Sequence, residues 1–109
     1  MEVIELYKLI KEFYGYKCRM IGINTESNQI ECFLYDSFIM KCYIDNRSES
    51  FTAGIDMGGE ILTDLLGRQC SSANNIKAIQ ECLRIIDDYC RLRLPDKYLD
   101  AYDEVYLSS

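Results

Sequence analysis

Histidine is absent from this sequence of 109 residues, and its absence limits the chemistry that the other side chains can do. Histidine is the commonest general base, the usual activator of a serine or cysteine nucleophile, and the commonest metal ligand. None of the six cysteines belongs to a C-x-x-C pair, and most of them stand beside apolar residues: Cys18, Cys32, Cys42, Cys70, Cys82 and Cys90. We therefore expect reduced, buried thiols, of which Cys70 is the most exposed, and no cysteine catalysis.

Four carboxylates near predicted strand ends are the candidates for a divalent metal site: Asp36, Asp45, Asp56 and Glu60. They do not form a D-x-D, ExK or calcium-loop pattern, so we interpret them as solvated turn residues. The glycine-rich segment 53–59 lacks the G-K-[ST] ending and the G-x-G-x-x-G spacing of phosphate-binding loops, and it favours a strand-to-helix turn. The sequence predicts a protein that is not an enzyme and holds no cofactor or metal.

The overall charge and the chain length limit the ligands, the cellular location and the number of domains that we expect. A net charge of −6 and a pI near 4.6 disfavour attraction to phosphate backbones, so we expect no direct nucleic-acid ligand. No run of about 18 apolar residues is present, and the charged N-terminus does not resemble a secretory signal. These features predict a cytoplasmic protein without membrane contact, folded as one domain over residues 1–109.

The hydrophobic pattern predicts an α+β fold with an N-terminal helix, a four-stranded antiparallel sheet, and then two to three C-terminal helices. Apolar residues at helical spacing indicate a first helix over 2–14. Four strands are expected at 17–23, 29–36, 38–45 and 50–56, with polar turns between them. A short helix over 61–66, a long one from Ser72 or Asn74 to Pro95, and a last one after Pro95 follow.

The two faces of the predicted sheet differ in composition. Alternation along the second and third strands directs one set toward the core: Ile30, Cys32, Leu34, Phe38, Met40, Cys42 and Ile44. The opposite face is aromatic, with Phe33, Tyr35 and Tyr43. Such a face is either covered by a helix or presented to a partner, and the sequence leaves both alternatives open.

The C-terminal tail combines carboxylates with tyrosines. Tyrosine has a rigid apolar body with a polar tip and is enriched where surfaces are buried on association. We interpret the following residues as the candidate partner-binding surface: Asp87, Asp88, Asp96, Tyr98, Asp100, Tyr102, Asp103, Glu104 and Tyr106. An acidic, tyrosine-bearing surface suits electrostatic steering onto a basic protein.

The order of helix, short strands and acidic helical tail, together with the segment GEILTDLLGR at 59–68, resembles the small immunity proteins of bacterial contact-dependent inhibition and polymorphic toxin systems. The resemblance implies a tight one-to-one complex with a cognate toxin domain. Because an acidic surface suits a basic target, and enzymes that act on nucleic acid are typically basic, we expect that toxin to be a nuclease whose basic cleft is occluded. Two alternatives stay open. One is an anti-CRISPR or other phage-encoded inhibitor that mimics nucleic acid, and the other is a structural homodimer built on the aromatic sheet face.

Overall fold

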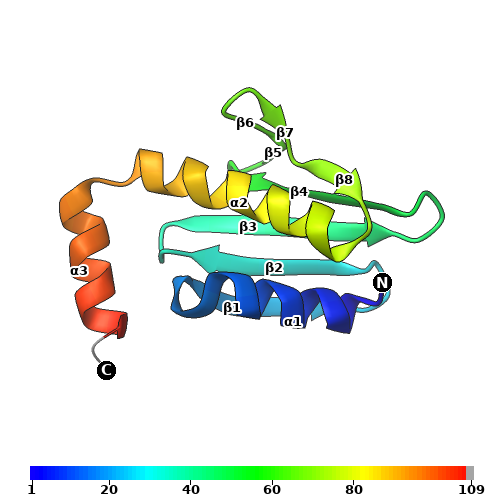
Figure 1. Ribbon diagram of the computed structural model, residues 1–109, viewed down its shortest axis with the longest axis horizontal. Coiled ribbons are helices and arrows are strands. Elements are labelled where there is room, and N and C mark those ends of the chain that lie inside the picture. The colour runs from blue at the N-terminus through cyan, green and yellow to red at the C-terminus, as the bar shows by residue number, and fades with distance from the viewer. Residues whose placement is uncertain (108–109) are drawn as a thin grey trace.

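The N-terminal half forms a helix followed by an antiparallel meander (Figure 1). The computed structural model describes residues 1–107, except for the side chains of Met20 and Ile21. Helix α1 spans Val3–Tyr14, and a 3-10 turn at Gly15–Lys17 leads into the sheet. Strands β1 (Cys18–Asn24), β2 (Gln29–Leu34), β3 (Phe38–Asp45) and β4 (Ser50–Asp56) are antiparallel neighbours in that order. The first helix and the meander of four strands are therefore confirmed, but the predicted sheet of four strands is too small, because two shorter strands extend it to six.

The segment after β4 is a set of short strands, so the helix expected over 61–66 is wrong. Strands β5 (Ile61–Leu62) and β8 (Ser71–Ala73) pair with opposite ends of the same edge of β4. Between them, β6 (Asp64–Leu65) and β7 (Arg68–Gln69) form a hairpin. Leu66 and Gly67 both have positive φ, as a two-residue hairpin turn requires. Apolar spacing alone could not distinguish this hairpin from one helical turn.

Two helices complete the chain. Helix α2 spans Ile76–Arg93 and crosses the sheet beside α1, and α3 spans Asp96–Leu107 at the end of the sheet (Figure 1). The N-cap of α2 is Asn75, whose side chain accepts a hydrogen bond from the backbone N–H of Ala78. The sequence predicts that this helix begins near Ser72 or Asn74; Ser72 lies within β8, and the cap is one residue beyond Asn74. The two-helix tail broken at Pro95 is confirmed.

One apolar core lies between the sheet and helices α1 and α2. Side chains that alternate inward from β2, β3 and β4 pack against the buried faces of both helices. These faces include Leu6 and Ile10 of α1 and Leu83 and Ile86 of α2. All six cysteines are buried, and Cys70 is fully so. The prediction that Cys70 is exposed is therefore wrong. Its N–H donates to the Thr63 carbonyl and its own carbonyl accepts from Ala53, so the hairpin segment holds it against β4.

Candidate functional site: an open sheet face and an acidic helix

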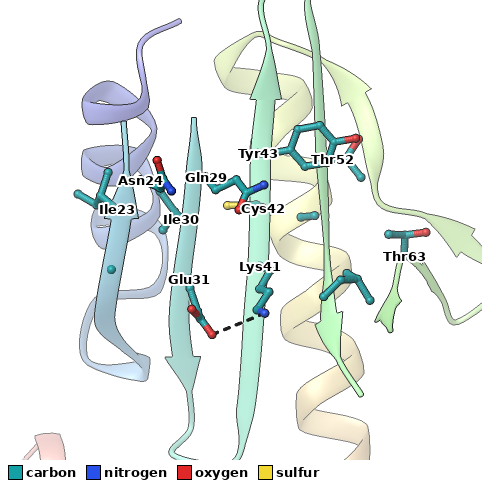
Figure 2. A pocket seen from close by; sticks show the side chains of 13 residues that line it. Ile23, Asn24, Gln29, Ile30, Glu31, Lys41, Cys42, Tyr43, Thr52 and Thr63 are labelled. Carbon is teal, nitrogen blue, oxygen red and sulfur yellow. Dashed lines mark ion pairs between the residues drawn. The ribbon is translucent and has the colours of Figure 1, made fainter. Parts of the chain in front are cut away.

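Helices α1 and α2 lie on the same side of the sheet, and the other face of strands β1 to β4 is open in the described part of the chain (Figures 1 and 2). Cross-strand pairing arranges the side chains of this open face in transverse rows. The central row consists of Gly22, Glu31, Lys41 and Gly54, and the row beside it consists of Asn24, Gln29, Tyr43 and Thr52. Side chains from four strands are thereby placed on one surface.

A groove of about 650 Å³ lies over these two rows (Figure 2). Gly22 lines it on β1, where a Cβ would meet no described atom within 4 Å apart from the flanking residues. The opposite wall is β5. A Cβ at Gly54 would lie 2.5 Å from Ile61 Cγ2 and 2.6 Å from the Leu62 carbonyl oxygen, so this glycine lets β5 cross closely over β4. Thr63 completes that wall.

The centre of the groove is charged. The Lys41 ammonium lies 3.2 Å from an Asp56 carboxylate oxygen and 3.9 Å from one of Glu31, and the pair with Glu31 is drawn in Figure 2. The Gly58 N–H, and after it Lys41, stabilise the Asp56 carboxylate and lower its pKa. All three side chains keep contact with solvent. One cation thus faces two carboxylates, which leaves an excess of negative charge at the middle of the face.

The negative charge of the protein is concentrated in the segment that forms this face. Residues 22–64 contain eight acidic and two basic side chains, so their sum equals the net charge of −6 of the whole chain. The segment before them carries four basic and three acidic residues, and the segment after them carries six basic and seven acidic residues. The helices are therefore almost balanced in charge, whereas the sheet and its turns are acidic.

Two of the three aromatic residues predicted for the second face lie on it. Phe33 and Tyr43 are 40% and 43% exposed. Tyr35 is fully buried, so its placement on that face is wrong. β2 ends at Leu34, and Tyr35 and Asp36 both have positive φ in the turn that follows. The alternation of strand side chains does not extend into such a turn, and Tyr35 points into the protein.

Helix α3 separates the two residue types of the predicted tail surface onto opposite sides. Asp96, Asp100 and Glu104 recur every four residues and are exposed. The tyrosines recur at the same spacing two residues later, at Tyr98, Tyr102 and Tyr106. Two residues correspond to roughly 200° around a helix, so the tyrosine stripe is opposite the carboxylate stripe. We identify the first three residues as the α3 carboxylate stripe.

The tyrosines anchor α3 to the end of the sheet. The Tyr102 hydroxyl donates to the Tyr16 carbonyl at 3.0 Å, and the Tyr98 hydroxyl donates to the Tyr35 carbonyl. Tyr106 donates to Asp36 at 2.7 Å. Tyr102 is 5% exposed, and this burial raises its pKa to about 12. These three hydroxyls contact the chain itself, a pairing that the sequence pattern did not indicate.

The other acidic residues of the predicted surface differ in their surroundings. Asp103 accepts a hydrogen bond from the Tyr16 hydroxyl at 2.7 Å. Asp87 accepts from the Tyr35 hydroxyl and lies 3.8 Å from the Lys17 ammonium. Asp88 is exposed on α2. The structure therefore brings Asp96, Asp100 and Glu104 together in one solvent-facing stripe, and it places Asp87 and Asp103 in contacts between elements.

The cysteines and carboxylates that were considered for catalysis or metal binding lie in surroundings that do not favour either role. Burial raises the pKa of the thiols of Cys42 and Cys90 to about 12 each, and that of Cys70 to about 11. Within residues 1–107, no three histidine, cysteine or carboxylate side chains gather as a metal site would need. None of the helices in that range has the length and apolar character to cross a membrane.

The open face and the α3 carboxylate stripe are thus the two surfaces that stand out. Comparison of the chain with protein-family models, curated proteins and solved structures finds no match.

Proposed function

We propose that this protein is a cytosolic immunity protein that binds a cognate protein toxin, a basic nuclease, and neutralises it by occluding the active-site cleft. The observation that carries the proposal is the uncovered sheet face, where the centre of a groove holds two carboxylates and one cation, within a segment (residues 22–64) whose charges sum to −6. Nuclease clefts are basic because they bind phosphate backbones. An acidic, hollowed surface is therefore complementary to the rim of such a cleft.

The groove has the composition of a protein-binding centre. Tyr43 supplies an exposed aromatic ring, and Asn24, Gln29, Thr52 and Thr63 supply amides and hydroxyls around it (Figure 2). Aromatic anchors ringed by polar groups are typical of the parts of an interface that contribute most to affinity. The α3 carboxylate stripe acts at longer range, by steering the basic toxin toward the complex.

Nucleic-acid mimicry, as in an anti-CRISPR protein, is less favoured by the same surface. A mimic presents a continuous row of negative charge, and Lys41 stands in the middle of this face between two carboxylates. A structural homodimer would instead bury the exposed rings of Phe33 and Tyr43, and the oligomeric state of the purified protein separates it from the proposed function.

The test is direct inhibition. The purified protein is mixed with the toxin domain encoded beside its gene, complex formation is followed by calorimetry, and cleavage of DNA and RNA is measured. We expect a one-to-one complex and loss of cleavage at equimolar protein. A neighbouring gene product that is neither bound nor inhibited would overturn the proposal.

The steering role of α3 has its own variant. Asp96→Lys with Asp100→Lys should lower the association rate by about tenfold at low salt and leave dissociation nearly unchanged. The matched control is Glu5→Lys with Glu12→Lys, which changes the net charge equally on the exposed side of α1. Equal rates for both variants would show that only overall charge matters. Asp103 is kept unchanged in this variant because it accepts a hydrogen bond from the Tyr16 hydroxyl, and its replacement would loosen α3.

A further inference from the structure

The groove over Gly22 is shaped to receive a side chain that projects from a convex partner. It is open at Gly22, where a Cβ would meet no described atom within 4 Å apart from the flanking residues, and it is closed at the other end by Ile61 and the β5 backbone. Glycine in the interior of a strand lowers the stability of the strand, and often marks a bulge or a place where a ligand or another backbone approaches closely; the register between β1 and β2 shifts beside Gly22. Gly22 has no positive φ that would require glycine for the conformation of the backbone.

The polar groups at the groove determine which side chain fits. Glu31 is the cross-strand neighbour of Gly22, and its carboxylate is turned toward Lys41 on the next strand (Figure 2). Lys41 lies 3.9 Å from Glu31 and 3.2 Å from Asp56, so Asp56 is the closer of its two partners. A carboxylate offers about four acceptor positions, and one ion pair at 3.9 Å leaves Glu31 able to accept hydrogen bonds from a further cation at the groove. Carboxylates pair best with guanidinium and ammonium groups, and charge-assisted hydrogen bonds are roughly twice as strong as neutral ones.

We propose that the groove above Gly22 is the docking site for a cationic side chain, arginine or lysine, on a protruding segment of the partner protein, with Glu31 as its carboxylate and Tyr43 as a flanking aromatic contact. This inference rests on the proposed function, and it identifies the part of the toxin that the open face binds. The acidity of residues 22–64 favours this occupant over an acidic or neutral one.

The decisive variant fills the groove without disturbing the fold. Gly22→Leu places a side chain in the empty space, and no neighbouring atom opposes its Cβ. We expect affinity for the toxin domain to fall by about a hundredfold, the size of an interface hot spot. The control is Ala101→Leu, which adds the same bulk at an exposed position of α3 and should leave affinity within about threefold.

The charge is tested separately. Glu31→Gln keeps the shape of the side chain and removes its charge, and we expect affinity to fall about tenfold. Its matched control is Glu26→Gln, the same change at an exposed residue of the β1–β2 turn, which should have little effect. Equal losses for the two variants would overturn the assignment to Glu31. Thermal unfolding of each variant verifies that the fold is retained.

A probe that does not depend on the toxin separates the two proposals. Amide shifts of the protein are followed by NMR during titration with N-acetyl-arginine amide, and with N-acetyl-alanine amide as the control. We expect arginine-specific shifts at Gly22, Glu31 and Lys41, which Gly22→Leu abolishes. If this result is obtained and the neighbouring gene product does not bind, the immunity function fails and the groove assignment stands.

The opposite results overturn the groove assignment. Toxin binding that is unchanged in Gly22→Leu would leave the immunity function intact and remove the groove from the interface. Arginine-induced shifts confined to α3 would place cation binding on the carboxylate stripe. A wild-type dimer that Gly22→Leu converts into a monomer would show that the occupant is a second copy of this chain.

Discussion

The same substitution at two glycines of the sheet should have opposite effects on stability. At Gly54, an added Cβ would lie 2.5 Å from Ile61 Cγ2 and 2.6 Å from the Leu62 carbonyl oxygen. The second contact is with backbone, so rotation of a side chain cannot relieve it. Gly54→Ala must displace β5 from the edge of β4, and its pairing there is only two residues long.

The expected magnitude follows from that clash. Overpacking of a core position costs about 1–3 kcal/mol, and the position here is buried. Because a loss of 1 kcal/mol lowers the Tm of a domain of this size by about 4–8 °C, we expect Gly54→Ala to melt about 10 °C lower. Gly22→Ala meets no atom within 4 Å and restricts the unfolded chain, so it should be stabilising by about 0.5 kcal/mol.

Urea denaturation and thermal melting of both variants measure the difference directly. NMR amide shifts of Ile61 and Leu62 should change in Gly54→Ala and remain close to wild type in Gly22→Ala. Equal stabilities for the two variants would refute the close crossing of β5 over Gly54, and with it the wall of the groove.

Three further predictions concern the anchoring of the helices and the buried thiols. Tyr102→Phe removes the hydrogen bond to the Tyr16 carbonyl and should lower the free energy of unfolding by about 1 kcal/mol, whereas Tyr43→Phe, at an exposed ring, should change it little; urea titration compares them. Asn75→Ala removes the N-cap of α2 and should cost about 1 kcal/mol, with Asn75→Ser restoring most of it, as followed by circular dichroism. Burial raises the folded pKa of Cys70 to about 11 and that of Tyr102 to about 12. The stability that these groups contribute is therefore complete below their unfolded pKa values and is lost as the pH rises toward the folded ones. The urea midpoint should fall between about pH 9 and pH 12, and a constant midpoint would contradict the burial of both groups.

The sequence predicted most of the elements because their signals are local. The amphipathic spacing of α1, the alternation in β2 and β3, and the break at Pro95 each depend on residues near one another in the chain. The short strands β5 to β8 could not be predicted in this way. Their conformation depends on pairing with the edge of β4, and the isolated segment 59–68 has the apolar spacing of a helical turn.

The candidate surface was predicted only in part. The sequence places Phe33 and Tyr43 on one face by alternation, and no helix within residues 1–107 covers that face. The groove was not foreseen, because Gly22 becomes its floor only when β1 pairs with β2 and β5 crosses over Gly54. No spacing rule relates residues 22 and 54, which lie on strands that do not touch each other.

The sequence by itself determined the charge, the absence of histidine, and the hydrophobic periods, and from these the α+β class follows. Only the tertiary structure decided which side of helix α3 packs against the rest of the protein. Residues at four-residue spacing share a side of α3, but whether the tyrosine side or the carboxylate side meets the protein depends on what lies beside the helix. The carbonyls of Tyr16 and Tyr35 accept the tyrosine hydroxyls, so the carboxylates face solvent.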